Sequence, residues 1–217
     1  IRPILRGKDI KRYGYEWADL WLIATFPSRH YDIDLYPAVK QYLLAFGIER
    51  LEQTGKVHTV NGEQIKSRKK TNNKWFETQD SISYWEDFSK PKIIFQEIVQ
   101  SSQFLYDETI HYFCNDTGRI IVGSQLPFIL GVLNSKLFFY AVKKFYGGGV
   151  LGEHGIRMKH TFFGNFPCLP YDKKIEDIAN HLSCNFDTKL AEELDRIIGE
   201  SYSLTEEEIS VIQKNLM

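Results

Sequence analysis

The order of the apolar patterns along the chain restricts its possible folds more than any other feature. Residues 126–146 have a helical pattern that Asn134-Ser135 divides in two, with Ser135 as the cap of the second helix. Four short apolar runs before it, with Asn115-Asp116-Thr117-Gly118 as the clearest turn, predict strands at residues 92–99, 103–106, 110–114 and 119–123. Strands and helices do not alternate regularly. The sequence therefore predicts an α+β fold, in which a mixed or antiparallel sheet of short strands packs against helices.

The first third of the chain has weaker but readable signals. Residues 17–26 are apolar and partly aromatic, which predicts a strand. A helical stripe follows, and Pro37 suits its first turn, whereas Gly47 is expected to break or weaken it. Residues 53–74 contain few apolar side chains. They predict an exposed excursion, with a hairpin around Asn61-Gly62.

Charge divides the chain into two parts. Residues 171–217 contain five Lys/Arg and eleven Asp/Glu, whereas the whole chain has a formal charge of -1. The first 170 residues are therefore positive overall, which keeps a nucleic-acid partner plausible. Near the end, Thr205 and Glu208 have the spacing of a capping box. We expect a binding domain at residues 1–170 and an acidic helical tail at 171–217 that packs on it or extends it.

No enzyme motif stands out in the sequence. The letters GGGVLG at residues 147–152 fit a dinucleotide-binding pattern, but they follow a helix rather than a strand and so predict a turn. Asp172-x-Lys174 and Asp187-x-Lys189 have the letters of a nuclease site, yet both lie in the acidic tail, where a solvated helix face is expected. The histidines and cysteines have no metal-ligand spacing. We expect no catalytic residues, no cofactor and no metal in this chain.

The three cysteines give an expectation about location. Cys114, Cys168 and Cys184 are odd in number and widely spaced, as expected for a protein of the reducing cytosol. No apolar run approaches the length of a membrane span and no signal peptide is visible, so we expect no membrane partner. The chain begins at Ile1 with residues that already resemble ordered structure. We interpret it as a fragment whose natural N-terminal part is missing.

A basic segment suggests a nucleic-acid partner. Residues 50–75 contain seven Lys or Arg residues against two acids, Glu52 and Glu63. Lys and Arg neutralise phosphates, and Arg and Asn can read guanine and adenine edges. A second basic stretch follows at residues 136–160, although a solvated loop remains the alternative for the first segment. The predicted DNA contacts are Lys66, Arg68, Lys69, Lys70, Asn72, Asn73, Lys74, Arg157, Lys159 and His160.

These candidates divide by chemistry. Lys69, Lys70 and Lys159 are expected to bind backbone phosphates, because an ammonium group neutralises charge without reading sequence. Trp75 is expected to anchor the root of the loop in the core rather than to stack on a base. The candidates for base edges are Arg68, Asn72, Asn73 and Arg157.

Ordered sequence blocks extend along nearly the whole chain. They are Ile4-Leu5-Arg6-Gly7-Lys8-Asp9-Ile10 with Arg12-Tyr13, Tyr36-Pro37-Ala38-Val39-Lys40, Lys74-Trp75-Phe76-Glu77, Phe88-Ser89-Lys90-Pro91-Lys92-Ile93, Leu133-Asn134-Ser135-Lys136-Leu137, Asn165-Phe166-Pro167 with Leu169-Pro170, and Leu204-Thr205-Glu206-Glu207-Glu208-Ile209. In these blocks and their order the chain resembles the TaqI-like C-terminal specificity domain of type IIG restriction–modification enzymes and related adenine-specific DNA methyltransferases.

The resemblance implies a division of labour. In that family an N-terminal domain binds S-adenosylmethionine and methylates adenine, some members add a nuclease, and the C-terminal domain reads the target in double-stranded DNA. The chain contains no Pro-Pro pair, so the family's catalytic Asn/Asp-Pro-Pro-aromatic motif is absent. The implied partners are a DNA duplex and the missing methyltransferase domain in cis, in the cytoplasm of a bacterium or archaeon. Pro3, Arg6, Gly7 and Asp9 are assigned to the junction with that domain.

Three other interpretations stay open at this point. A specificity subunit for a separate methylase would usually contain two similar halves, and the sequence has no repeat. A protein-interaction domain would have no salt-dependent affinity for DNA. An autonomous enzyme would need a deep pocket with perturbed titratable groups.

Overall fold

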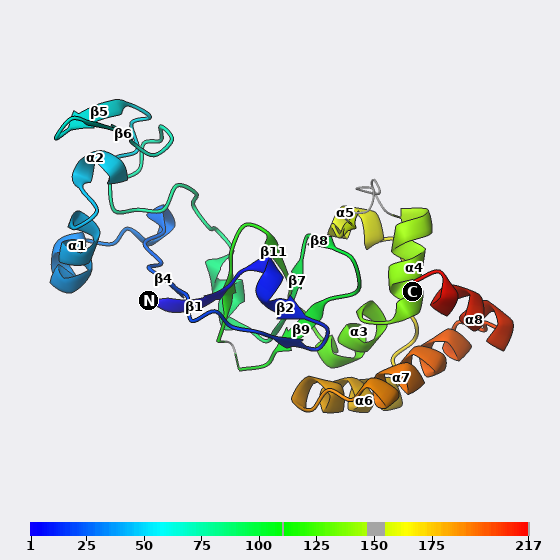
Figure 1. Cartoon of the computed structure of the whole chain (residues 1–217). Helices are drawn as coiled ribbons and strands as arrows, with labels where there is room; N and C mark the ends of the chain where they lie inside the picture. Colours follow the sequence, from blue (N-terminus) through cyan, green and yellow to red (C-terminus); the bar gives the residue numbers. More distant parts are fainter. Residues whose placement is uncertain (110, 147–154, 217) are drawn as a thin grey trace. The chain divides into compact units, whose positions relative to one another are not determined.

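Figure 1 shows the computed structural model of the chain, which describes residues 1–109, 111–146 and 155–216. Contacts divide the chain into two compact units. Ile1 and Ile23–Glu86 form unit 1, and Arg2–Leu22 with Asp87–Met217 form unit 2. Residues 171–216 thus belong to unit 2 together with most of the first 170 residues, so the compact units divide the chain at places other than residue 170. The glycine-rich motif at residues 147–152 lies outside the described residues.

Unit 1 combines short helices with one β-hairpin. Its elements are η2 (Pro27–Arg29), η3 (Ile33–Leu35), α1 (Pro37–Leu44), α2 (Ile48–Leu51), β5 (Val57–Val60) and β6 (Glu63–Lys66). A further 3-10 helix, η4 (Trp85–Ser89), follows at its boundary. The helix that begins at Pro37 is confirmed. It ends before Gly47, whose φ of 85° lies in the left-handed region that favours glycine.

The hairpin of unit 1 is also confirmed. Val57–Val60 pairs antiparallel with Glu63–Lys66, and Asn61 and Gly62 connect the two strands with φ values of 52° and 85°. Both positive angles suit the two-residue turn for which Asn-Gly is the preferred pair. The hairpin therefore positions the basic segment that begins at Lys66.

Unit 2 contains the remaining sheets, all short. One three-stranded sheet has the order β10-β1-β4 and the other has the order β11-β7-β9. In the first sheet β1 is parallel to β10 and antiparallel to β4, whereas both pairings in the second sheet are antiparallel. Their bounds are β1 (Arg2–Leu5), β4 (Trp21–Leu22), β7 (Lys92–Gln96), β9 (Phe104–Asp107), β10 (Phe113–Cys114) and β11 (Gly118–Ile121). Two further pairs are β2 (Ile10–Lys11) with β3 (Gly14–Tyr15) and β8 (Ile98–Val99) with β12 (Ile156–Arg157), and a 3-10 helix, η1, spans Gly7–Asp9.

Unit 2 also contains helices, of which α3 packs against strands β7 and β9. They are α3 (Leu126–Leu133), α4 (Lys136–Ala141) continued by the π-helix η5 (Val142–Tyr146), α5 (His160–Phe163), α6 (Lys173–Cys184), α7 (Thr188–Ser201) and α8 (Glu206–Lys214). The three acidic helices α6, α7 and α8 are drawn in orange to red in Figure 1. Gly131 lets α3 approach α6 closely, because a Cβ there would lie 3.0 Å from Ile175. Phe95, Phe104 and Phe138 lie in the core between sheet and helices.

The predicted fold class and two predicted helix caps are confirmed. Small, mostly antiparallel sheets and packed helices make the chain an α+β protein with a helical C-terminal region. The Ser135 hydroxyl accepts a hydrogen bond from the Phe138 N–H, which begins α4 at the predicted position. Thr205 and Glu208 form the capping box at the start of α8.

The strand predicted at residues 17–26 is wrong in extent. Only Trp21–Leu22 pairs with β1. Asp19 has a φ of 54°, which no strand can accommodate, and Leu20 is exposed rather than buried. The apolar composition of this segment therefore did not reflect burial on both faces of a sheet.

No single helix in the described ranges is long and apolar enough to cross a membrane. The pair Leu126–Leu133 and Lys136–Tyr146, bent by 59°, reaches that composition only when both helices are counted together.

Candidate nucleic-acid interface

A buried glutamine fixes the backbone of the basic segment in unit 1. The Gln53 side chain is in the core of the loop, where its Nε2 donates to the carbonyls of Lys74 (3.0 Å) and Glu77 (2.8 Å). Its Oε1 accepts from the Thr71 hydroxyl at 2.7 Å, and the Thr71 N–H donates to the Gln53 carbonyl at 3.0 Å. The loop at residues 66–77 is therefore held in one conformation by its own unit.

Arg68 completes this frame from inside the loop. Its Nε donates to the Leu51 carbonyl at 2.8 Å, its Nη1 to the Glu77 carbonyl at 2.9 Å, and its Nη2 to the Trp75 carbonyl. Burial lowers the pKa of Arg68 from its usual value. Because the planar guanidinium is occupied by three backbone carbonyls, Arg68 is a structural residue here. In this arrangement its guanidinium faces the carbonyls of the loop and not a base edge.

Asn73 has a similar structural role, and Trp75 lies beside it. The Asn73 Nδ2 donates to the carbonyls of Thr78 (3.0 Å) and Gln79 (2.8 Å), so its amide is also engaged within unit 1. Trp75 is half-buried, and its ring meets Phe76 edge-on at 5.6 Å between centroids. These contacts hold the end of the basic segment against the rest of the unit.

The other predicted residues of this loop lie on its surface, where the Lys74 ammonium is 5.6 Å from the centroid of the Phe76 ring. They are exposed, and among the described residues none of the four lysines forms an ion pair. Unpaired ammonium groups on a fixed backbone are suited to phosphate contacts, because little ordering is needed on binding. These exposed residues are Lys66, Lys69, Lys70, Asn72 and Lys74.

In unit 2, three basic side chains converge on one carboxylate. Glu97 lies between β7 and β8, and its Oε2 accepts from Nη2 of Arg119 on β11. Its Oε1 lies 3.6 Å from Nε of Arg157 and 3.6 Å from Nζ of Lys159. We call Glu97, Arg119, Arg157 and Lys159 the Glu97 cluster. Pairing of β12 with β8 and a 2.6 Å hydrogen bond from the Met158 N–H to the Glu97 carbonyl bring the cluster together.

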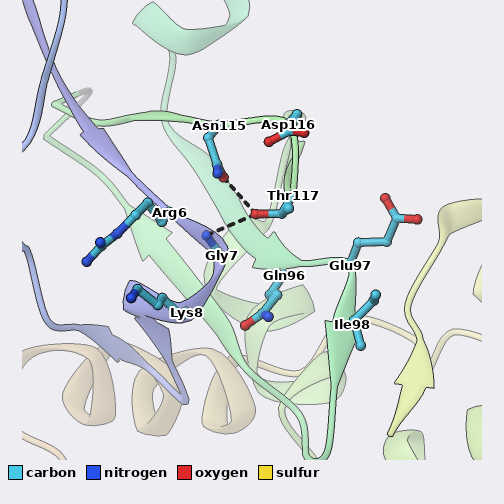
Figure 2. A pocket seen from close by; sticks show the side chains of 9 residues that line it. All are labelled: Arg6, Gly7, Lys8, Gln96, Glu97, Ile98, Asn115, Asp116 and Thr117. Carbon is cyan, nitrogen blue, oxygen red and sulfur yellow. Dashed lines mark hydrogen bonds between the residues drawn. The ribbon is translucent and has the colours of Figure 1, made fainter. Parts of the chain in front are cut away.

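A cleft of about 490 Å³ lies beside Glu97 in unit 2. In Figure 2 the Arg6–Lys8 turn is on the left, Glu97 and Ile98 are on the right, and the Asn115–Thr117 turn is above them. The Gly7 N–H donates to the Thr117 hydroxyl at 3.3 Å, and that hydroxyl donates to Asn115 Oδ1 at 2.8 Å. The cleft is lined by Arg6, Gly7, Lys8, Gln96, Glu97, Ile98, Asn115, Asp116 and Thr117.

Two cations line the cleft, Arg6 and Lys8, and only Arg6 forms an ion pair within the described residues. Arg6 makes a two-pronged ion pair with Asp9, with Nη2 at 2.8 Å from Oδ1 and Nε at 3.0 Å from Oδ2. The hydrogen bond from Arg6 lowers the pKa of Asp9, which holds the pair in its charged form. Lys8, by contrast, is exposed, and within the described residues its ammonium forms no ion pair. Lys8 is therefore the available cation of this cleft.

The ten residues predicted to contact DNA lie in both units. Lys66 to Lys74 lie in unit 1, whereas Arg157, Lys159 and His160 lie in unit 2, where His160 is exposed at the start of α5. Glu97 and Arg119 were not predicted as site residues. Neither has a local sequence signal, because the partners of Glu97 come from segments more than twenty residues away. Within the described ranges, no group of three His, Cys, Asp or Glu could hold a metal ion.

Comparison with known proteins identifies the family. A search of curated proteins finds no match. The model of the family described as the TaqI-like C-terminal specificity domain matches residues 2–150, which is more than half of the chain. The chain therefore belongs to the family of TaqI-like C-terminal specificity domains, and this makes it a DNA target-recognition module of restriction–modification enzymes.

Proposed function

We propose that this chain binds a DNA duplex and reads its target sequence for an adenine-specific DNA methyltransferase whose catalytic domain belongs to the same longer protein. The methyl donor S-adenosylmethionine and the methyl-transfer step are assigned to that other domain. The chain has no Pro-Pro pair, and so it lacks the motif that would place methyl transfer here. A base-modifying enzyme needs energy to extrude the target base, and a separate recognition module supplies contacts that offset that cost.

One observation carries the proposal: exposed, unpaired lysines on a loop whose backbone is fixed from within. Gln53 and Arg68 hold the loop by hydrogen bonds to its carbonyls. Its exposed ammonium groups can neutralise phosphates, and the exposed Asn72 amide has the donor and acceptor that match an adenine edge. In unit 2, Arg157, Lys159 and His160 form a second proposed set of contacts.

The DNA-binding part is tested by duplex affinity measured at several salt concentrations. Replacing Lys69 and Lys70 with Ala should weaken binding and reduce the slope of log K against log salt by about 1.8, at about 0.9 for each lost phosphate contact. The matched control is Lys173→Ala with Lys174→Ala on the acidic helix α6, which changes the net charge equally. Equal effects of the two pairs, or no salt-dependent binding by the unchanged chain, would refute a contact at this loop.

The methyltransferase part needs a different test. The gene upstream of the Ile1 codon should encode a glycine-rich cofactor motif and an Asn/Asp-Pro-Pro-aromatic motif. Protein expressed with that upstream region should transfer labelled methyl groups from S-adenosylmethionine to adenine in a duplex. An upstream region with neither motif would remove the methyltransferase from the proposal and leave DNA recognition in place.

A further inference from the structure

The Glu97 cluster has an unusual charge balance. Three cations share one carboxylate, which leaves a surplus of two positive charges. Ion pairs on the acidic helices have the opposite balance, since Lys173 lies between Glu176 and Asp177, and Arg196 lies between two glutamates. Among the described residues, no other acid pairs with three cations. Like charges repel, so an anion that binds there would reduce the repulsion among the three cations.

A buried donor in the cluster also lacks an acceptor. The Arg157 Nε is shielded from solvent but has no hydrogen-bond partner in the described part of the chain. Its distance of 3.6 Å to Glu97 is too long for a hydrogen bond. An unsatisfied buried donor is unfavourable in the free protein, and a shift of the Arg157 side chain toward an incoming anionic oxygen would satisfy it. The side chains of Arg157 and Lys159 are 42% and 37% exposed, so an anion in solution can reach them.

Resting on the proposed function, we infer that the Glu97 cluster binds one backbone phosphodiester of DNA, and that Glu97 limits how tightly it does so. Arg119, Arg157 and Lys159 supply the positive charge. Glu97 holds these three side chains together and cancels one of their charges, so that a phosphate is bound without the cluster becoming a strong non-specific anion site. Lys8 lies on the other side of the cleft that Glu97 lines.

The inference predicts opposite effects from neighbouring side chains. Lys159→Gln should lower duplex affinity and reduce the salt slope by about 0.9, because one phosphate contact is lost. Glu97→Gln keeps the shape of the side chain but removes its charge. It should raise the affinity for non-target duplex and steepen the salt slope. The control Lys174→Gln makes the same change in net charge as Lys159→Gln on the exposed face of α6 and should leave binding unchanged.

The experiment measures binding of fluorescent duplexes by the full 217-residue chain, with the melting temperature of each variant recorded alongside. A second set of duplexes carries a neutral methylphosphonate at one backbone position at a time. When the neutral linkage replaces the contacted phosphate, Lys159→Gln should no longer lower duplex affinity. If the cluster instead binds free phosphate, the effect of Lys159→Gln on affinity should be the same for every position of the neutral linkage. If Glu97→Gln does not fold, Lys159→Gln and the methylphosphonate series still decide whether the cluster binds a backbone phosphate.

The outcomes separate the two proposals. If the unchanged chain binds DNA but Lys159→Gln behaves like Lys174→Gln, the phosphate site is wrong and DNA recognition stands. If a folded Glu97→Gln variant weakens non-target binding, the limiting role of Glu97 is wrong. If the unchanged chain has no salt-dependent affinity for any duplex, the proposed function and this inference both fail.

Discussion

The Arg12 guanidinium and the Asp195 carboxylate form an ion pair that joins the beginning of unit 2 to its acidic helices. Nη2 of Arg12 lies 3.1 Å from Oδ1 and 3.2 Å from Oδ2 of Asp195, whose side chain is only 4% exposed. Asp195 also accepts the Lys136 N–H at 2.9 Å, and the Arg12 Nε donates to the Asn134 carbonyl at 3.1 Å. Burial raises the pKa of Asp195, although Arg12 opposes the shift. The acidic helices are thus part of the unit's structure.

Asp195→Ala should lower the free energy of unfolding by about 3 kcal/mol, since removing one partner of a buried pair leaves the other without compensation. Urea unfolding followed by circular dichroism measures the change. The neighbouring Arg196→Ala is the control, because Arg196 makes only exposed ion pairs with Glu193 and Glu200. Its unfolding curve should overlay that of the unchanged chain. Similar curves for both variants would contradict a structural role for the pair.

A second buried pair should make stability depend on pH. Burial alone would raise the pKa of Asp107. The hydrogen bonds that its carboxylate accepts from Lys92 and from the Tyr112 and His111 N–H groups outweigh burial, so the pKa is lowered overall. Because the pKa is lower in the folded protein, the ionised carboxylate stabilises the fold at pH values above the unfolded pKa of about 3.9. This stabilisation is lost as the pH falls through the folded pKa. Asp107→Asn should therefore lower the melting temperature at pH 7, and the difference should shrink below about pH 4. A difference that is constant with pH would contradict this assignment.

The residues that hold the basic loop in shape can be tested separately from the lysines proposed to bind DNA. Arg68→Ala removes hydrogen bonds to three carbonyls and should destabilise unit 1 by about 2 kcal/mol. Arg68→Lys should not rescue it, because an ammonium group cannot reproduce the planar fork. The double variant Lys69→Ala with Lys70→Ala should keep the melting temperature and lose only DNA affinity. Thermal unfolding and duplex binding of the same samples make the comparison. A lower melting temperature in the lysine variant would show that these lysines also stabilise the loop.

Gly7 tests the packing of the cleft. A Cβ at Gly7 would lie 2.8 Å from Oγ1 of Thr117 and 2.9 Å from Cγ of Gln96. Gly7→Ala should therefore cost about 1–3 kcal/mol through overpacking. Gly14 is the control, because a Cβ there would meet nothing within 4 Å. Calorimetric melting temperatures of the two variants should differ clearly, and equal values would mean that the β1–η1 turn moves freely away from Thr117.

Local signals in the sequence predicted the local structure. The hairpin at Asn61-Gly62, the cap at Ser135 and the capping box at Thr205 each depend on residues within four positions of one another. Their backbone angles and hydrogen bonds are set by neighbours in the chain, so the sequence alone defines them. The strand predicted at residues 17–26 was wrong in extent because it depended on contacts that are not local. Burial there depends on distant segments, and apolar letters alone do not report it.

The candidate site was predictable only in part, for the same reason. Basic composition located the Lys66–Lys74 segment, but composition does not distinguish a guanidinium that faces solvent from one that binds carbonyls. Arg68 was predicted as a reader of base edges, yet its partners Leu51 and Glu77 lie on either side of it in the sequence and meet it only through the fold. Glu97 gave no signal at all, because its three cations come from segments far from it in the sequence, namely β11, β12 and the residue before α5.

The inward position of Arg68 has a consequence for how such a module changes over time. Its guanidinium and the Gln53 amide keep the loop's shape without using the side chains at Lys66, Lys69, Lys70, Asn72 and Lys74. Those outward residues can be exchanged one by one while the backbone beneath them remains intact. A new target preference can therefore arise from point substitutions on an unchanged scaffold, and a library randomised at these five positions is the natural starting point for redirecting it.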